Sequence, residues 1–170
     1  GIVGPFSSFI NCGLGVTELR GVFRTDDRGT NWRMVPLTGS EAPRSLRAQN
    51  AGAIHFSLAV DQADPNTIYV AGYGQESPLT NMAASLDGCK IEAARIYRGS
   101  VVGEDVQWNS LVCAGANGTS PAKGTRQLVV DGAGELLEAD GGGIYRMSRL
   151  NQASQRRWTS AGGDLQIAEL

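Results

Sequence analysis

The sequence predicts an all-β protein assembled from a repeated unit of four short strands. Glycine occurs 23 times in 170 residues without a regular period, which favours many tight turns. Runs rich in Val, Ile, Leu and Tyr are short and are bounded by turn residues. A β-branched residue, an aromatic residue and an arginine also recur three times along the chain, and a tryptophan follows each of them.

The repeat is clearest in the last two strands of the unit. The aromatic-arginine pairs and their tryptophans are, in chain order, Phe23-Arg24 with Trp32, Tyr97-Arg98 with Trp108, and Tyr145-Arg146 with Trp158. Because these are the only tryptophans in the chain, we expect one tryptophan in each unit. Its position predicts a fourth strand that pairs with the strand carrying the arginine.

The first two strands of the unit are visible in the second and third copies. Residues 54–61 and 126–131 each read as a strand that ends in Val-Asp. A turn follows in both cases, and residues 67–74 and 135–142 then read as the next strand. The sequence therefore predicts four consecutive antiparallel strands in each complete unit.

We expect one structural region over residues 1–170, with units at about 1–37, 53–113 and 125–160. Residues 164–170 alternate apolar and polar side chains and read as one more strand, which closes the first unit. Such repeats are typical of β-propeller blades. Three blades are fewer than the roughly four to eight of a closed propeller, so the chain is expected to be a partial propeller or half of a ring that a second chain completes.

A defined motif lies between the third and fourth strands of the first unit. Residues 25–32 read TDDRGTNW, so Thr25, Asp27, Gly29 and Trp32 fit the pattern Ser/Thr-x-Asp-x-Gly-x-x-Trp. This pattern resembles the Asp-box of BNR-repeat β-propellers, a family that includes sialidases, tandem-propeller xyloglucanases and sortilin-type receptor ectodomains. The resemblance implies that the four residues are structural and remote from any active site.

The residue types in the motif suit a structural role. Asp27 can accept hydrogen bonds from backbone N–H groups of the turn, and Gly29 can adopt a positive φ. Trp32 is expected to fill the core of its blade. The whole chain is also similar to Asp-box propeller modules of large secreted bacterial proteins, which implies an extracellular or cell-surface location.

Two acidic residues late in the chain are candidate ligand-binding residues. Glu138 and Asp140 have the same parity in one predicted strand, so we expect them to face the same side. Two carboxyl groups held roughly 5–10 Å apart can hydrolyse a glycoside. The alternative role of Asp140 is to stabilise the glycine-rich turn that follows it. Asp61 and Asp131 recur at equivalent turn positions, which indicates capping of turns.

Several classes of function are disfavoured. The net charge of −2, without a basic patch, argues against nucleic acid as a partner, and no apolar run reaches the roughly 18 residues of a membrane-spanning helix. His55 is the only histidine and is expected to be a core or turn-facing residue, so no catalytic triad, metal site or cofactor is predicted. The three cysteines allow at most one internal disulfide, for which Cys89 and Cys113 are the expected pair, and three buried free thiols are an equally open alternative.

These observations favour a non-catalytic, secreted or cell-surface module that binds carbohydrate or protein. One alternative is a glycoside hydrolase, or the propeller part of one, with carboxylates in a central cleft. The other is a structural scaffold that assembles through its blades, as a homo-oligomer or with the remainder of a longer propeller. The lack of a recognisable catalytic set of side chains favours the binding module or the scaffold over the enzyme.

Overall fold

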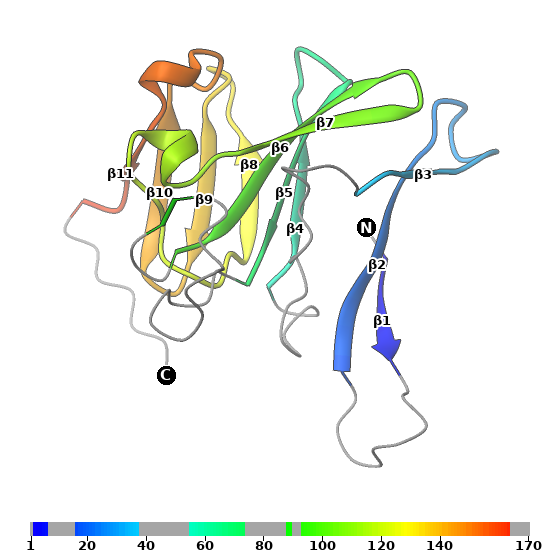
Figure 1. Ribbon diagram of the computed structural model, residues 1–170, viewed down its shortest axis with the longest axis horizontal. Helices are drawn as coiled ribbons and strands as arrows, with labels where there is room; N and C mark the ends of the chain where they lie inside the picture. The colour runs from blue at the N-terminus through cyan, green and yellow to red at the C-terminus, as the bar shows by residue number, and fades with distance from the viewer. Residues whose placement is uncertain (1, 7–15, 38–54, 74–87, 90–92, 164–170) are drawn as a thin grey trace.

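The protein is an all-β structure, as the sequence predicts (Figure 1). The computed structural model describes residues 2–6, 16–37, 55–73, 88–89 and 93–163. Within these residues there are eleven strands and two short 3-10 helices, and no helix is long or apolar enough to cross a membrane. The expected closing strand at residues 164–170 and most of the loop at residues 75–92 lie outside the described residues.

The strands form three antiparallel sheets. The first sheet contains β1 (Ile2–Phe6), β2 (Val16–Arg24) and β3 (Arg33–Val35). The second contains β4 (Ser57–Val60), β5 (Thr67–Gly72), β6 (Arg95–Val102) and β7 (Asp105–Ser110). The third contains β8 (Gln127–Val130), β9 (Leu136–Asp140), β10 (Gly143–Ser148) and β11 (Arg157–Ser160). The helices η1 (Ala114–Ala116) and η2 (Ala153–Gln155) precede β8 and β11.

The second and third sheets repeat one pairing scheme. In each of them four strands pair in chain order, and the third strand carries the Tyr-Arg pair while the fourth carries the tryptophan. Trp108 is opposite Gly99, and Trp158 is opposite Met147, in both cases the residue after the arginine. A Cβ atom at Gly99 would lie 2.6 Å from the Trp108 ring, so only glycine leaves room for this indole.

The second sheet is the middle layer, between the first and third sheets (Figure 1). Its strand β5 is buried at every position because both faces are covered. Ile68 and Val70 pack with residues of the first sheet, whereas Tyr69 and Ala71 pack with residues of the third. The two faces of this strand alternate as expected for an extended chain.

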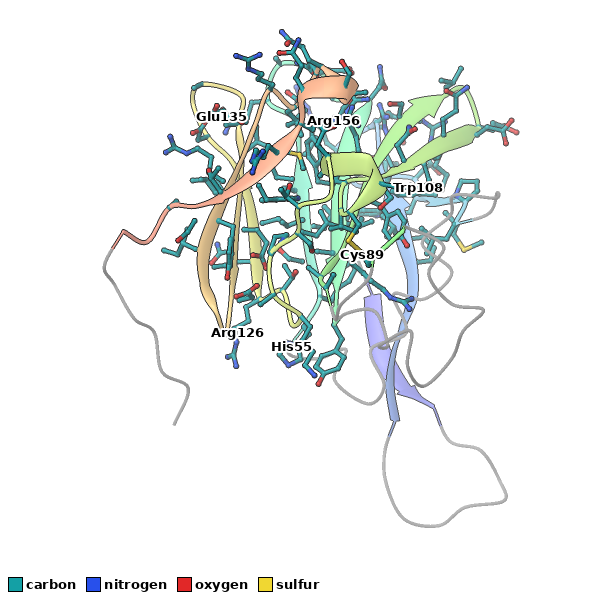
Figure 2. The ribbon with its side chains drawn as sticks, turned by 60° about the vertical axis from the view of Figure 1, so that its left-hand side comes forward. His55, Cys89, Trp108, Arg126, Glu135 and Arg156 are labelled. Atoms are coloured by element: carbon teal, nitrogen blue, oxygen red, sulfur yellow. A yellow bond between two sulfur atoms is a disulfide. The ribbon has the colours of Figure 1, made fainter. Side chains whose placement is uncertain are left out.

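The Cys89–Cys113 disulfide links the residue stretch before β6 to the end of β7 (Figure 2). Both cysteines are buried, and they are separated by 24 positions in the sequence. Closing a loop of this length in the unfolded chain accounts for about 3 kcal/mol of stability. Of the two interpretations that the sequence leaves open, the structure shows the disulfide.

The three sheets remain separate, and no sheet closes on itself within the described residues.

Tight turns join the first two strands of the second and third sheets. Asp61 and Asp131 each accept a hydrogen bond from the backbone N–H two residues later, at 2.9 Å in both cases. The interpretation of these two aspartates as turn caps is confirmed.

Candidate functional site

Glu138 and Asp140 lie on the same face of β9, which packs toward the second sheet. The burial of β9 alternates strictly, so Leu136, Glu138 and Asp140 are all buried while the residues between them are half-buried. Glu138 retains only 1% of its exposed area. The structure thus brings together the two acidic residues that the sequence singles out. Acidic side chains are rarely buried so completely without a counter-charge.

Asp140 holds the turn that leads into β10. Its Oδ1 atom accepts hydrogen bonds from the backbone N–H groups of Gly142, at 2.6 Å, and Gly143, at 3.0 Å. Its Oδ2 atom is buried and has no hydrogen-bond partner. Burial raises the pKa of Asp140, and the two backbone N–H groups oppose that rise. One oxygen of this carboxyl group therefore holds the turn, and contacts with the Glu138 side chain and the Ala122 backbone also oppose the rise of the pKa of Asp140.

Glu138 carries the most strongly shifted carboxyl group. Neither of its buried oxygens makes a well-formed hydrogen bond, and neither does the Oγ1 atom of Thr125. Burial raises the pKa of Glu138 to about 9, with a further contribution from the charge of Asp140. Contacts with Asp140 and Thr125 also shift the pKa of Glu138, upward and downward respectively. The side chain is therefore protonated at neutral pH, and it can donate a hydrogen bond as well as accept one.

Tyr145 completes the cluster from the neighbouring strand. It is the cross-strand partner of Glu138 on β10 and is half-buried. Burial raises the pKa of its phenol, and the charges of Asp140 and Glu138 add to the rise. A Cβ atom placed at Gly142 would lie 3.1 Å from the Tyr145 hydroxyl and 3.2 Å from Asp140 Oδ1, so the phenol and the carboxyl group converge on this glycine. We call Thr125, Glu138, Asp140 and Tyr145 the acid cluster.

The segment before β8 covers the acid cluster. Ala122 lies against Gly142, since a Cβ atom there would be 3.0 Å from the Ala122 methyl group. Gly124 follows, and its N–H donates to the Tyr73 carbonyl while its own carbonyl lies 3.1 Å from Nδ1 of His55. His55 is thus a half-buried, turn-facing residue. Figure 2 shows His55 and Arg126 at the same end of the molecule, away from Glu135 and Arg156.

The hairpin of residues 25–32 joins β2 and β3 of the first sheet, whereas the acid cluster lies on the third sheet. Asp27 accepts hydrogen bonds from the Thr25 hydroxyl at 2.8 Å and from the backbone and side chain of Asn31 at 2.9 and 2.6 Å. These bonds, led by the one from the Asn31 backbone, lower the pKa of Asp27 to about 2. The Gly29 N–H donates to the Thr25 hydroxyl at 2.8 Å, and its φ of 93° favours glycine. All of these contacts are internal to the turn.

The expectation that Trp32 fills a blade core is wrong. Its side chain is 62% exposed, whereas Trp108 and Trp158 are buried. The Trp32 indole N–H donates to the Gly29 carbonyl at 3.1 Å, within its own hairpin. The physical reason is that the two buried tryptophans are covered by a neighbouring sheet, and no sheet of the described residues lies over Trp32.

Replacing Asp27 by alanine is expected to lower the melting temperature by a few degrees, because the turn loses its hydrogen-bond acceptor. Asp26→Ala is the matched control: Asp26 is exposed and pairs only with Arg24 and Arg33 among the described residues. Such surface ion pairs contribute little. Since the pKa of Asp27 is lowered, its contribution is present above pH 3.8 and is lost as the pH falls through about 2. Equal melting temperatures for the two variants in calorimetry would contradict the role of Asp27.

A hollow of about 330 Å³ lies between the first and second sheets. Its walls are mostly aliphatic, and Arg24, Asp26 and Trp32 stand at its polar side. The Arg24 side chain crosses to the second sheet, where it donates to the Asn66 side chain at 2.9 Å. Asp26 is the acidic residue among those that line this hollow, and it forms ion pairs with Arg24 and Arg33, so the hollow offers mainly apolar contact.

Comparison with models of known families, with curated proteins and with solved structures finds no match to this chain. The described residues contain no group of three or more His, Cys, Asp or Glu side chains that could hold a metal ion. The acid cluster is therefore the candidate functional site of the described residues. Sequence reasoning missed two of its members. Tyr145 could have been found as the partner of Glu138 across a tight hairpin, whereas no sequence signal marks Thr125.

Proposed function

We propose that the protein is a non-catalytic binding module for carbohydrate, with the acid cluster as its ligand site. One observation carries the proposal. Four buried side-chain oxygen atoms gather in one place without a well-formed hydrogen bond: Oε1 and Oε2 of Glu138, Oδ2 of Asp140 and Oγ1 of Thr125. Contacts among these three side chains still influence the pKa values of the two acids, so the group is only partly satisfied by the protein. Buried polar atoms are nearly always satisfied in folded proteins, so such a group is explained by a polar ligand.

The chemistry of the cluster suits a ligand rich in hydroxyl groups. The protonated Glu138 carboxyl can donate one hydrogen bond, either to Asp140, whose pKa a hydrogen bond from Glu138 lowers, or to a ligand, and Asp140 Oδ2 can accept one. Each sugar hydroxyl is both a donor and an acceptor, so two adjacent hydroxyls can satisfy both groups. The ring of Tyr145, the half-buried cross-strand partner of Glu138, adds an apolar surface beside them.

The arrangement of the sheets supports a propeller-type module. The four-stranded meanders stack face to face, and their first strands, β4 and β8, lie next to each other. The Ser57 hydroxyl on β4 accepts a hydrogen bond from the Leu128 N–H on β8 at 2.8 Å. The buried disulfide supports an oxidising, extracellular or cell-surface location. We therefore propose that each sheet is one blade of an Asp-box type propeller.

The test of the ligand site is binding to a glycan array, followed by calorimetry on the glycans that bind. We expect Glu138→Gln, Asp140→Asn and Thr125→Val each to weaken binding by about tenfold or more, which corresponds to about 1.4 kcal/mol. Glu135→Gln is the matched control, because Glu135 lies at the opposite end of β9. Unchanged affinity in all three variants would overturn the assignment of this site.

One observation favours glycoside hydrolysis as a second candidate function. Glycosidases pair a protonated carboxylic acid with a second carboxyl group, and Glu138 has the raised pKa that the acid requires. Turnover of aryl glycosides by the wild-type protein would establish this activity. Loss of turnover with retained binding in Glu138→Gln would then assign the acid, whereas binding without turnover supports the non-catalytic module.

A further inference from the structure

Trp108 and Trp158 make the same contact between successive sheets. The Trp108 indole N–H donates to the Pro36 carbonyl of the first sheet at 2.9 Å. The Trp158 indole N–H donates to the Leu111 carbonyl of the second sheet at 2.7 Å. The acceptors lie four residues after Trp32 and three residues after Trp108, just past the last strand of each sheet. Each tryptophan is thus seated on the end of the sheet before it.

Trp32 has the equivalent position in the first sheet. The register of β2 and β3 continues by one pair to place Trp32 opposite Thr25, the residue after Arg24. On this side Phe23 and Met34 are direct cross-strand partners, whereas the next pair, Val22 and Val35, packs toward the second sheet. Met34 is 62% exposed, as is Trp32. Phe23 and Trp32 also border the hollow between the first and second sheets, whereas Met34 does not line it. We call Phe23, Trp32 and Met34 the leading face.

The outer side of the third sheet has exposed apolar residues and a backbone carbonyl equivalent to the acceptor for Trp158. Val129 and Ile144 are 43% and 36% exposed, and they alternate with residues buried toward the second sheet. Ala161 lies three residues after Trp158. Its N–H donates to the Ile144 carbonyl at 2.7 Å, as the Leu111 N–H donates to the Ile96 carbonyl at 2.8 Å. Ala161 is therefore the equivalent of Leu111, the acceptor for Trp158. We call Val129, Ile144 and Ala161 the trailing face.

We propose that two copies of this chain associate head to tail, with the leading face of each copy on the trailing face of the other. The Trp32 indole N–H, which donates to the Gly29 carbonyl in the single chain, then exchanges this acceptor for the Ala161 carbonyl of the second copy. The contact continues the one seen twice between the sheets, so the structure itself indicates what covers the leading face. Two copies use both pairs of faces, which closes a ring instead of an open filament. The acid cluster plays no part in this association.

Figure 1 shows that the two faces belong to opposite sides of the stack. The first sheet is at one side, the third sheet is at the other, and the second lies between them. A head-to-tail contact therefore adds a sheet to each end without disturbing the existing packing. It also removes large exposed apolar side chains from water, which is the driving force of such association.

The mass of the 170-residue chain in solution, measured by light scattering after size exclusion, tests the proposal. We expect twice the monomer mass for the wild-type chain. Met34→Glu, on the leading face, and Ile144→Glu, on the trailing face, are each expected to raise the dimer dissociation constant at least about tenfold. Val102→Glu is the control, because Val102 is exposed at the end of β6 and belongs to neither face.

A mixture of the two variants distinguishes this geometry from a symmetric contact between like faces. In a mixed head-to-tail dimer, one contact contains both substitutions and the other contains none, so mixing Met34→Glu with Ile144→Glu is expected to restore dimer. A contact between two leading faces gains no such intact interface. A monomeric wild-type chain at its highest soluble concentration, or a mixture that stays monomeric, would overturn the proposal. Far-UV circular dichroism shows that each variant is folded.

Discussion

Trp158→Ala is expected to lower the free energy of unfolding by about 4 kcal/mol, the usual cost of removing a large buried aromatic side chain. Trp158 is 4% exposed and packs in the core cluster shared by the second and third sheets. Its indole N–H also donates the buried hydrogen bond to the Leu111 carbonyl. The substitution leaves a cavity between the sheets and a backbone carbonyl without its partner, and both effects destabilise the folded state.

Urea denaturation followed by circular dichroism measures this loss. Trp158→Phe keeps most of the ring but removes the N–H donor, so we expect a smaller loss of about 1–2 kcal/mol. This variant also keeps the prediction testable if the alanine variant does not fold. Thr159→Ala is the control, because its side chain is exposed on the same strand. A loss below about 1 kcal/mol in Trp158→Ala would show that the inter-sheet contact contributes little.

The strand positions could be read from the sequence because their signals are local. Residues 67–72 form β5 from a run of β-branched and aromatic residues that starts just after the Asp64-Pro65-Asn66 turn. The Asp64 carboxylate accepts hydrogen bonds from Asn66 and Thr67 in that turn. The spacing of the tryptophans from the Tyr-Arg pairs likewise predicts which strand pairs with which. Local chemistry of this kind does not depend on the rest of the fold.

Burial could not be read in the same way, because it depends on which sheet lies over a residue. Trp32, Trp108 and Trp158 each follow an aromatic-arginine pair in the sequence, but a neighbouring sheet covers only Trp108 and Trp158. The raised pKa of Glu138 has the same origin, since Thr125 and the segment that contains Ala122 come from outside its hairpin. The sequence can show that Glu138 and Asp140 share a face, but not that this face is the interior one.

The disulfide could be predicted from the sequence only in part. Three cysteines without a C-x-x-C motif limit the choice to one internal bond or none. The decision depends on whether two Cβ atoms approach within bonding range, which the meander of β6 and β7 determines. That meander brings the ends of the two strands together, so Cys89 before β6 and Cys113 after β7 meet.

Between about pH 5 and pH 9, the free energy of unfolding of the wild-type protein is expected to fall by several kcal/mol because of Glu138. The pKa of Glu138 is about 9 in the folded protein, against an ordinary value of 4.5. In this window the folded state keeps a proton that the unfolded state has lost, so rising pH favours unfolding. Each pKa unit of difference corresponds to about 1.4 kcal/mol, which sets an upper limit of about 6 kcal/mol for a rise from 4.5 to 9.

Glu138→Gln isolates this effect, because glutamine has nearly the same shape and does not titrate. We expect urea denaturation across the window to show a much weaker pH dependence for the variant, and a stability above that of the wild type near pH 8. Asp140 also has a raised pKa, so a residual slope remains in the acidic part of the window. Glu135→Gln is the control that keeps the full slope, since Glu135 lies outside the acid cluster and its carboxylate contacts Arg146 instead. If Glu138→Gln and the wild type share one pH profile, Glu138 is ionised in the folded protein, and the ligand site would then offer two acceptors instead of a donor and an acceptor.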